Sequence, residues 1–590
     1  MSDKVAELNG LISQDDASDW VSSLWDKFNQ QRGGKIDEWN ELRQFLFATD
    51  TTSTSVNTLP HSNTTTVPKL TQIRDNLHSN YISSLFPNDD WLSWQAFSAD
   101  SAKKSKAEAI EAYMSNKTRE GGFRTEISKL LMDYIDFGNA FAMPSFEARY
   151  RKLADETIVA DYIGPKAVRI SPLDIVFNPL ATSFKDTFKI VRSVKTLGEI
   201  QKMANDEPDQ RFWQGIVDKR LAIRMGAYGP EDWNKANAYS LDGFGDLYEY
   251  YMSDYVEILE FYGDYHDTEA GLLKTDVVLT IADRSMTIRE EPIPSWFGGA
   301  PIYHVGWRHR PDNLWAMGPL DNIVGMQYRL DHLENLKSDA LDLAVSPPIK
   351  VIGEVESFEW APREEITIDE GGDVGVMSVD LNGIAAATNN AIQLMELMEL
   401  FAGAPRDAMG IRTPGEKTAT EVNQLSNAAG RIFQEKITHF EVELLEKLLN
   451  GMLETARRNL DESDVIRITD SDLGAVEFLT ITKEDIVANG VIRPIGARHF
   501  AKQSQDLQNL IGVFNSPLGA LVGPHTSGKE LTKLVNDIAG LDGYNIFSPN
   551  VAVFEQQETQ QIANQASEDL EVQSQTPAEG SAEGEPEVDL

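Results

Sequence analysis

Gly403-Ala-Pro-Arg-Asp-Ala-Met-Gly-Ile-Arg-Thr-Pro-Gly-Glu-Lys417 is the stretch of this chain that decides the fold we predict. Its glycines and prolines recur at spacings that forbid a continuous helix, so it predicts a loop. Three basic residues, Arg406, Arg412 and Lys417, outnumber its two acidic residues, which gives the loop a charge of +1. The loop is either an ordinary exposed connection or a segment that holds basic side chains against a polyanion.

Helices are predicted on both sides of this loop. Asn389–Phe401 precedes it with helical periodicity. After it, Thr418-Ala-Thr-Glu421 has the spacing of a capping box, in which the side chains of Thr418 and Glu421 each accept a hydrogen bond from the other residue's backbone N–H. The helix that begins there is predicted to reach Leu460, about 60 Å at 1.5 Å per residue, a length that indicates an elongated assembly.

A further helix and a small β module are predicted before Asn389. Leu320–Ala344 has helical periodicity over about 38 Å, and Ser346-Pro347-Pro348 ends it. Because a lone helical hairpin cannot bury both of its sides, we expect Leu330 to lie at a contact between subunits. The β module contains three strand candidates, namely Ile349–Val355, Glu364–Asp369 and Val374–Val379.

The region from Ala140 to Arg310 predicts an α+β domain, because short β-rich runs follow one another there. Thr196-Leu-Gly-Glu199 also has capping-box spacing and predicts a helix inserted among the strands. Ala282-Asp-Arg284 predicts the turn of a β-hairpin. The β-rich runs are Ala167–Phe177, Tyr255–Tyr262, Asp276–Ile281 and Ser285–Arg289.

The two ends of the chain are predicted from the same kinds of pattern. The Ser/Thr/Asn-rich run from Asp50 to Thr66 has no periodicity and predicts an exposed arm. Residues 555–590 hold ten acidic residues and no basic ones, which predicts a disordered tail. Helices are expected around 20–28, 36–46, 70–85, Ala102–Met114, Phe123–Asp136, Lys502–Phe514 and Lys529–Ala539, and a short extended element at Val476–Ile481.

Composition limits the class of protein. The chain has 590 residues, 93 acidic against 53 basic, a formal charge of −40 and no cysteine. Disulfides, zinc ribbons, iron–sulfur clusters and thiolate nucleophiles are therefore excluded. No run of about 18 apolar residues suggests a membrane span and the N-terminus does not resemble a signal peptide, so we expect a soluble, unexported chain. The acidity either serves solubility alone or keeps any DNA contact local and brief.

No stretch of the sequence makes a convincing catalytic centre. Gly523-Pro-His-Thr-Ser-Gly528-Lys529 has the frame of a phosphate-binding loop, but Glu530 stands where a Ser or Thr must bind magnesium. His304 and His309 have arginine neighbours that disfavour a bound cation, so a structural role is the better interpretation. The acidic run 461–472 lacks the glycine and the terminal glutamate of a calcium loop. We expect no enzyme, no cofactor and no metal site.

The order of the predicted elements resembles that of portal proteins, the head-to-tail connectors of tailed bacteriophages. The sequence most similar to that family is Ala404-Pro-Arg-Asp-Ala-Met-Gly410 followed by Thr-Ala-Thr-Glu421. Asp136-Phe-Gly-Asn139 and Ile170-Ser-Pro-Leu-Asp174 resemble portals of podophages in particular. The resemblance covers roughly residues 70 to 500 and lies mainly in the order and length of elements.

The resemblance implies an α+β fold with a wing or body, a helical stem, a small β clip, a long central helix and a helical crown. It assigns these parts to the following ranges: 1–68, N-terminal helical segment and Ser/Thr-rich arm; 69–318, wing or body; 319–345, first stem helix; 346–382, clip; 383–402, second stem helix; 403–417, channel loop; 418–460, long wing helix; 461–554, crown and C-terminal part of the body; 555–590, disordered acidic tail.

The resemblance also implies a function. Portals are dodecameric rings at one capsid vertex of the virion, assembled in the host cytoplasm, and double-stranded viral DNA passes through them during packaging and ejection. Their partners are further copies of the chain, the major capsid protein, the terminase large subunit and head-to-tail adaptor or tail proteins, with no membrane. Arg406, Arg412 and Lys417 would form three rings that face the axis and contact DNA, and Thr418 and Glu421 would cap the helix after the loop.

Two other interpretations remain open at this point. An acidic scaffolding or adaptor protein of a large assembly would fit the charge and would need no channel loop. A degenerate P-loop NTPase built on Lys529 would require ATP turnover that disappears in Lys529→Ala. An annular oligomer of about twelve copies would favour the portal over the scaffolding or adaptor protein.

Overall fold

The computed structural model describes the following residues of the chain: 16–47, 65–86, 91–97, 104–153, 156, 158–206, 215, 217–218, 254–267, 272–284, 286–294, 298–353, 371–376, 381–403, 432–460, 463–469, 476–487 and 490–494. The structure is mixed, with 51% helix and 31% strand, which agrees with the predicted α+β class. The chain divides into two compact units, one of residues 1–466 and 480–497 and one of residues 467–479 and 498–590. The elements below belong to the first unit, except that β14 (Ser463–Thr469) and β15 (Val476–Thr482) extend into the second.

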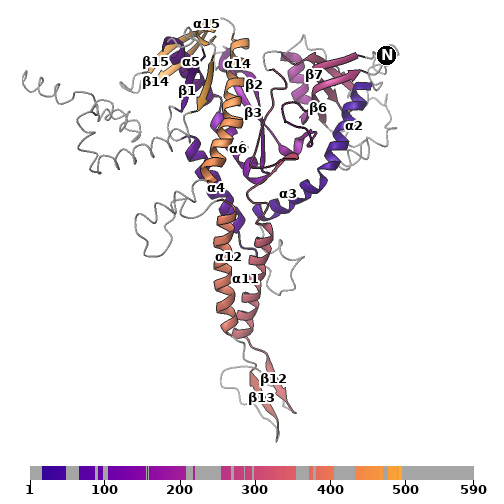
Figure 1. The fold of residues 1–590 in the computed structure, drawn as a ribbon, viewed down its shortest axis with the longest axis vertical. Coiled ribbons are helices and arrows are strands. Elements are labelled where there is room, and N and C mark those ends of the chain that lie inside the picture. The colour runs from indigo at the N-terminus through magenta and orange to yellow at the C-terminus, as the bar shows by residue number, and fades with distance from the viewer. Residues whose placement is uncertain are drawn as a thin grey trace, which may run out of the picture. The chain divides into compact units, whose positions relative to one another are not determined.

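A five-stranded antiparallel meander forms the larger sheet (Figure 1). Its strands, in spatial and chain order, are β4 (Ile175–Phe177), β5 (Lys189–Thr196), β6 (Tyr255–Asp267), β7 (Leu272–Ala282) and β8 (Met286–Pro292). Helix α2 (Asp16–Gln31) packs on this sheet and inserts Val21 and Trp25 into its apolar cluster. Trp20 adds an edge-on contact to Phe261, with ring centroids 5.1 Å apart. The first helix is therefore part of the core of the α+β region.

Two local predictions within this sheet are confirmed. Thr196 N–H donates to Glu199 Oε2 at 2.8 Å and Glu199 N–H donates to Thr196 Oγ1 at 3.3 Å, which is a capping box at the start of α7 (Leu197–Asp206). The β7–β8 hairpin turns through Asp283 and Arg284, whose φ angles of 50° and 54° are left-handed. The predicted run Ala167–Phe177 is interrupted by the 3-10 turn η1 (Pro172–Asp174).

A three-stranded sheet combines two strands that precede the five-stranded sheet in the chain with one that follows it. Its spatial order is β3 (Ile158–Ile170), β2 (Asn139–Lys152) and β9 (Tyr303–Gly306). The side-chain amide of Asn139 donates to Ala316 O and accepts from Ala316 N, both at 3.0 Å. His304 Nε2 lies 3.0 Å from Asn139 Oδ1, and its ring stacks on Phe141. Burial lowers the pKa of His304 to about 3, so the ring is neutral and has a structural role, as the sequence suggested.

Most predicted helices of the body are present, with some ends displaced. α4 (Lys69–Leu85) and α6 (Phe123–Asp136) confirm the predictions, whereas α5 (Lys104–Glu120) continues beyond Met114. Gly138 follows α6 with φ of 69°, and a Cβ there would lie 2.3 Å from Gly318 N, so only glycine fits. The remaining elements of the body are α3 (Gly33–Leu46), β1 (Leu92–Ala96) paired with β16 (Gly490–Pro494), β10 (Arg308–Arg310) paired with β11 (Asn313–Met317), and α15 (Lys483–Ile486).

Two long helices pack side by side after the body, α11 (Val324–Val345) and α12 (Leu381–Phe401) (Figure 1). Between them in the chain, β12 (Ile349–Ile352) and β13 (Asp373–Val376) form an antiparallel pair. α12 begins eight residues before the predicted Asn389, because its alanine-rich first turns outweigh Asn382 and Gly383. The strand candidate Glu364–Asp369 lies outside the described residues.

The C-terminal half of the predicted long helix is confirmed. Residues 432–440 are helical, a π-helical turn η3 (Glu441–Leu445) follows, and α14 (Glu446–Asn459) completes the helix. The predicted beginning of this helix at Thr418, the helices near Lys502–Phe514 and Lys529–Ala539, the Gly523–Lys529 motif and the acidic tail lie outside the described residues.

Candidate assembly surface

The helix pair α11–α12 exposes much of its apolar surface. Eleven of the 22 large apolar side chains that are exposed in the described residues lie between positions 336 and 401. None of the described side chains between positions 336 and 390 is buried, whereas the five-stranded and the three-stranded sheet both bury side chains. The helix-pair surface, as we name it, comprises Leu336, Leu341, Leu343, Val345, Val351, Ile352, Val376, Ile392, Leu397, Leu400 and Phe401.

The exposed apolar side chains of this surface favour association in water. Each Å² of apolar area kept from water is worth about 25 cal/mol, so a set of exposed Leu, Ile, Val and Phe side chains is a strong drive to associate. The β12–β13 pair has only four residues in each strand, and an isolated two-stranded sheet of that size is marginal in water. Contiguous exposed apolar patches mark interaction sites. The helix-pair surface is therefore a candidate surface for assembly.

A polar ladder on α11 fixes the first half of the helix pair to the segment before α4. Gln327, Asp331 and Asn335, spaced by one helical turn, are all buried. Val67 N–H donates to Asp331 Oδ1 at 2.9 Å and Thr65 N–H donates to Asn335 Oδ1 at 2.7 Å. Gln327 Nε2 donates to Val67 O at 2.6 Å. The ladder thus binds the backbone of residues 65–67 through hydrogen bonds, as a neighbouring strand would.

The attachment also contains a buried carboxyl group and a buried ion pair. Burial raises the pKa of Asp331 to about 6, against the hydrogen bonds from Val67 N–H and Gln327 that favour its ionised form. Lys69 Nζ forms an ion pair with Glu399 of α12, and the two side chains are 4% and 7% exposed. α12 is therefore tied to α4 by a buried pair, while the ends of α11 and α12 that adjoin β12 and β13 bury none of their described side chains.

Leu330 is not where the sequence placed it. Its side chain is fully buried within a single copy of the chain, so the prediction that it lies at a contact between subunits is wrong. α11 continues its apolar periodicity past Asn335, and its first half is covered by α4, by the 65–67 segment and by α3, whose Phe45 packs edge-on against Tyr328. The positions suited to a contact between copies are those of the helix-pair surface.

The two ends of segment 404–431 meet at Trp307. A Cβ on Gly403 would lie 3.6 Å from Ile432 Cγ2 and 3.7 Å from Trp307 Cζ2. Trp307 Nε1 donates to Tyr81 Oη at 3.2 Å, and the Lys436 ammonium lies 5.2 Å from the centre of the Trp307 ring. This buried tryptophan therefore lies where the described chain enters and leaves segment 404–431, a place that we call the base of the segment.

The residues that sequence reasoning singled out in the loop are not brought together by the described structure. Arg406, Arg412 and Lys417, and the cap formed by Thr418 and Glu421, lie outside the described residues. What the structure adds is the position of both ends of the segment that carries them.

A histidine pair lies beside this base. The Nε2 atoms of His309 and His439 are 3.0 Å apart, so one ring donates and the other accepts. Burial is the main cause that lowers the pKa of both rings; Lys436 lowers both further, and Glu443 opposes this. In the part of the chain that the structure describes, no group of three or more His, Cys, Asp or Glu residues is arranged to hold a metal ion.

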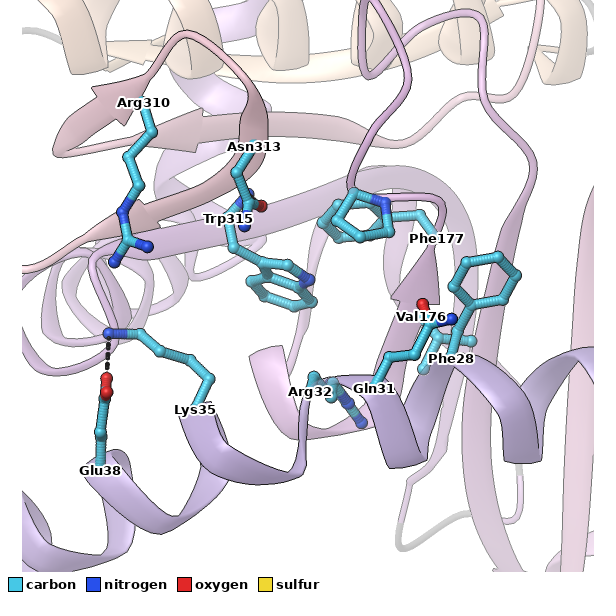
Figure 2. A pocket seen from close by; sticks show the side chains of 11 residues that line it. Phe28, Gln31, Arg32, Lys35, Glu38, Val176, Phe177, Arg310, Asn313 and Trp315 are labelled. Carbon is cyan, nitrogen blue, oxygen red and sulfur yellow. Dashed lines mark hydrogen bonds and ion pairs between the residues drawn. The ribbon is translucent and has the colours of Figure 1, made fainter.

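A recess of about 200 Å³ lies at the junction of α2 and α3 (Figure 2). Lys35 Nζ is 2.9 Å from Glu38 Oε2 and 2.8 Å from Asp321 Oδ2. Arg32 donates to backbone carbonyls of residues 172, 173 and 175 at 2.5 to 2.8 Å. These charged groups satisfy one another or the backbone, so the recess mainly reflects how the N-terminal helices are held to η1 and β4.

No protein-family model matches the chain, and no curated protein matches it. None of the described helices combines the length and apolar character needed to cross a membrane.

Proposed function

We propose that this chain is the protomer of a portal, a dodecameric ring at one vertex of a phage capsid that conducts viral DNA during packaging and ejection. The observation that carries the proposal is the helix-pair surface, which one copy of the chain leaves open to water. A ring of copies would cover these side chains, since a heterologous contact repeated around an axis closes into a ring. The role is structural, and a separate terminase supplies the energy of translocation.

The order of the observed elements supports this proposal. α11, the β12–β13 pair and α12 follow the α+β body, as first stem helix, clip and second stem helix would. The channel loop, 403–417, would begin at Gly403, which lies beside Ile432 and Trp307. The long wing helix would begin at Thr418, outside the described residues. The helix from 432 to 459 would be the described part of the long wing helix.

The charge of the helix pair also suits a conduit. α11 contains four acidic and two basic residues and α12 contains two acidic and no basic residues. Asp331 and Glu399 are buried, and Glu399 is paired with Lys69, so the charged side chains that reach the surface leave the pair at −2. Repeated around a ring, this charge keeps a duplex away from the walls within a Debye length of about 10 Å at 0.1 M salt. The loop, at +1, would supply the few contacts to phosphate.

The proposal includes partners. The clip would bind the terminase large subunit during packaging and a head-to-tail adaptor afterwards, and the body would contact the major capsid protein in the virion. Such contacts would be made by the assembled ring.

The proposal is tested by imaging the purified full-length chain by negative-stain electron microscopy and measuring its mass. We expect rings of about twelve copies of the 65.7 kDa chain. Leu400→Asp with Phe401→Asp, two exposed positions of α12, should abolish rings and leave a folded protomer. Leu180→Asp, at a 77% exposed position in the body, is the matched control and should still form rings. A monodisperse monomer of the wild type, or rings from the double variant, would contradict the proposal.

A second experiment tests the DNA contacts of the loop. The variant Arg406→Ala/Arg412→Ala/Lys417→Ala should form rings but fail to retain or fully package DNA, with the defect worst at high salt, because each phosphate contact releases counterions. Packaging at the wild-type level would refute the loop contacts and leave the ring intact. Irregular, non-annular complexes of the wild type would favour a scaffolding protein.

A further inference from the structure

The His309–His439 pair joins two elements at the base of the segment. His309 lies on β10, and His439 lies on the helix that runs from 432 to 440. The Nε2 atoms of the two rings are 3.0 Å apart, and the ring planes are nearly perpendicular, at 87°. An imidazole nitrogen accepts a hydrogen bond only while it carries no proton, so at least one ring must be neutral. This contact between β10 and the helix therefore depends on protonation.

The fold makes room for the ring of His309. A Cβ on Gly306 would lie 2.9 Å from His309 Cε1 and 2.4 Å from the Cβ of Ala316, so only glycine allows this close approach. Behind His309 lies His304, with ring centroids 6.5 Å apart. His304 Nε2 contacts Asn139, and burial lowers the pKa of His304 to about 3, so this neighbour carries no charge between pH 4.5 and 7.5. His309 is thus placed by the packing of β9 and β11.

Other contacts also hold the helix from 432 to 440. Phe433 stacks on Tyr81, with ring centroids 4.9 Å apart. The Lys436 ammonium lies 5.2 Å from the centre of the Trp307 ring, and Lys436 O accepts a hydrogen bond from Tyr134 Oη at 3.2 Å. Of the contacts named here, only the histidine pair consists of side chains whose ordinary pKa lies between pH 5 and 8. A change of pH in that range therefore acts on this helix through the pair.

The charged groups that act on the two rings come from the helix that carries His439. Lys436 disfavours protonation of both rings, and Glu443 favours it. Glu443 is itself paired with Lys447 at 2.5 Å. Glu435, which also favours protonation of His439, lies 3.8 Å from Lys436. Each of these carboxylates is therefore shared with a lysine, and neither is reserved for an imidazolium.

β10 places an arginine on each side of His309 in the chain and contains no acid. The Arg308 guanidinium lies 5.1 Å from the centre of the Trp307 ring. Arg310 lines the recess at the junction of α2 and α3 (Figure 2). A positive charge on His309 therefore gains no compensating charge from its own strand.

Acid should break the pair in two steps. The first proton is tolerated, because a charged ring can donate to its neutral partner. The second proton leaves two donors and two positive charges face to face at 3.0 Å. A histidine in an unfolded chain has a pKa of about 6.5, and burial is the main cause that lowers the pKa of both rings in the fold. The stabilisation linked to the pair is therefore complete above about pH 6.5 and is lost as the pH falls below that value.

We propose that the His309–His439 pair is an acid-sensitive latch, which holds the helix from 432 to 440 against β10 and releases it when both rings carry a proton. Its release frees this helix at the point where the chain leaves segment 404–431. Every group of the latch belongs to one copy of the chain, so this proposal does not depend on the proposed ring.

The latch is tested by hydrogen–deuterium exchange of the full chain at pH 7.5 and pH 4.5, with labelling times scaled to the intrinsic exchange rate at each pH. We expect the protection of amides 433–440 to fall at least about tenfold at pH 4.5, as the loss of about one hydrogen bond implies. The amides of β6 should stay protected, which distinguishes local release from unfolding. Unchanged protection of 433–440, or an equal loss in β6, would overturn the proposal.

Glutamine variants separate the two protons. His309→Gln/His439→Gln keeps a neutral hydrogen bond, so the helix should stay protected at both pH values. His439→Gln alone should also resist acid, because a protonated His309 can still donate to an amide oxygen. The matched control His266→Gln removes an exposed histidine of β6 and should respond to acid as the wild type does. Loss of protection at pH 4.5 in the double variant, or in His439→Gln to the extent seen in the wild type, would contradict the latch.

Discussion

The five-stranded sheet with α2 and the helix pair α11–α12 differ in where their apolar side chains find partners. In the sheet, strands β6 and β7 bury almost every inward-facing residue against α2 or the neighbouring cluster. In the helix pair, burial is confined to the half near α4, and the rest is open. The sheet is therefore specified by contacts within one copy, whereas half of the helix pair leaves its apolar side chains without such contacts.

The polar groups show the same difference. Arg284 in the sheet region is completely buried and pairs with Glu257 and Asp26. The pair Lys69–Glu399 and the ladder on α11 mark the boundary at which burial ends. Beyond that boundary no described polar side chain of the helix pair is buried. Substitutions on the body side of this boundary should therefore change the free energy of unfolding, whereas substitutions beyond it should change assembly.

Arg284→Ala should have the largest effect on the folding of the body. Arg284 donates to Glu257 at 2.7 and 3.0 Å and to Asp26 at 2.7 Å, and its removal leaves the Glu257 carboxylate buried without this partner. We expect a loss of about 3 to 5 kcal/mol in the free energy of unfolding, measured in urea. The control Arg289→Ala breaks an exposed pair with Glu291 and should cost less than about 1 kcal/mol. Equal costs would show that the sheet does not depend on its buried pair.

Lys69→Met should have the next largest effect, at the boundary itself. The change leaves Glu399 buried without its ammonium partner and should cost about 3 kcal/mol. The double variant Lys69→Met/Glu399→Leu removes both charges and should recover most of that loss. The measurement is thermal or urea unfolding of both variants. If the double variant is as unstable as the single one, the ion pair contributes more to stability than the cost of burying its two charges.

Asp331→Asn should change the pH dependence of the attachment. An unfolded aspartate has a pKa of about 3.9, and burial raises the folded value to about 6, so folding favours the protonated form. The stabilisation linked to this group is complete below about pH 4 and is lost as the pH rises through 6. Asparagine keeps the acceptor for Val67 N–H, so the variant should be about 1 kcal/mol more stable at pH 8. The difference should disappear near pH 4, and a constant difference across this range would contradict the assignment.

Val345→Ser should have the smallest effect on folding. Its side chain is 85% exposed at the end of α11, so the free energy of unfolding of an isolated protomer should change by less than about 0.5 kcal/mol. Assembly at low protein concentration should nevertheless weaken, as measured by analytical ultracentrifugation. A large loss of protomer stability would show that this end is packed within one copy.

Local patterns were sufficient to predict much of the fold. α4 and α6 follow from apolar spacing, and the capping box at Thr196 and Glu199 has the expected hydrogen bonds. The hairpin at Asp283 and Arg284 follows from its position between two β-rich runs. These features depend on residues a few positions apart, so a sequence contains their causes directly.

Features that depend on distant residues could not be predicted. The periodicity of α11 does not say that Leu330 is buried within one copy of the chain, beside a segment that bonds to Asp331, and the error at that position arose from this. Arg74 and Arg169 lie far from Asp136 and Asp133 in the chain, so nothing in their spacing indicates the two ion pairs that they form. The weak signal that could have pointed to these pairs is that Asp133 and Asp136, one turn apart, lie within or next to the largely apolar residues 130–135 of α6.

The π-helical turn Glu441–Leu445 affects how this chain tolerates the deletion of one residue. A π turn accommodates an extra residue relative to the α-helix on either side of it. Deleting one residue there would allow a regular helix, and the turns on either side would keep nearly the same orientation relative to each other, because the wider turn already absorbs the extra residue. Lys436 and His439 would then stay at Trp307 and His309, whereas deleting a residue from a regular part of the helix would rotate them by about 100° relative to α14. The same deletion at the exposed end of α11 would disturb no described contact with the body.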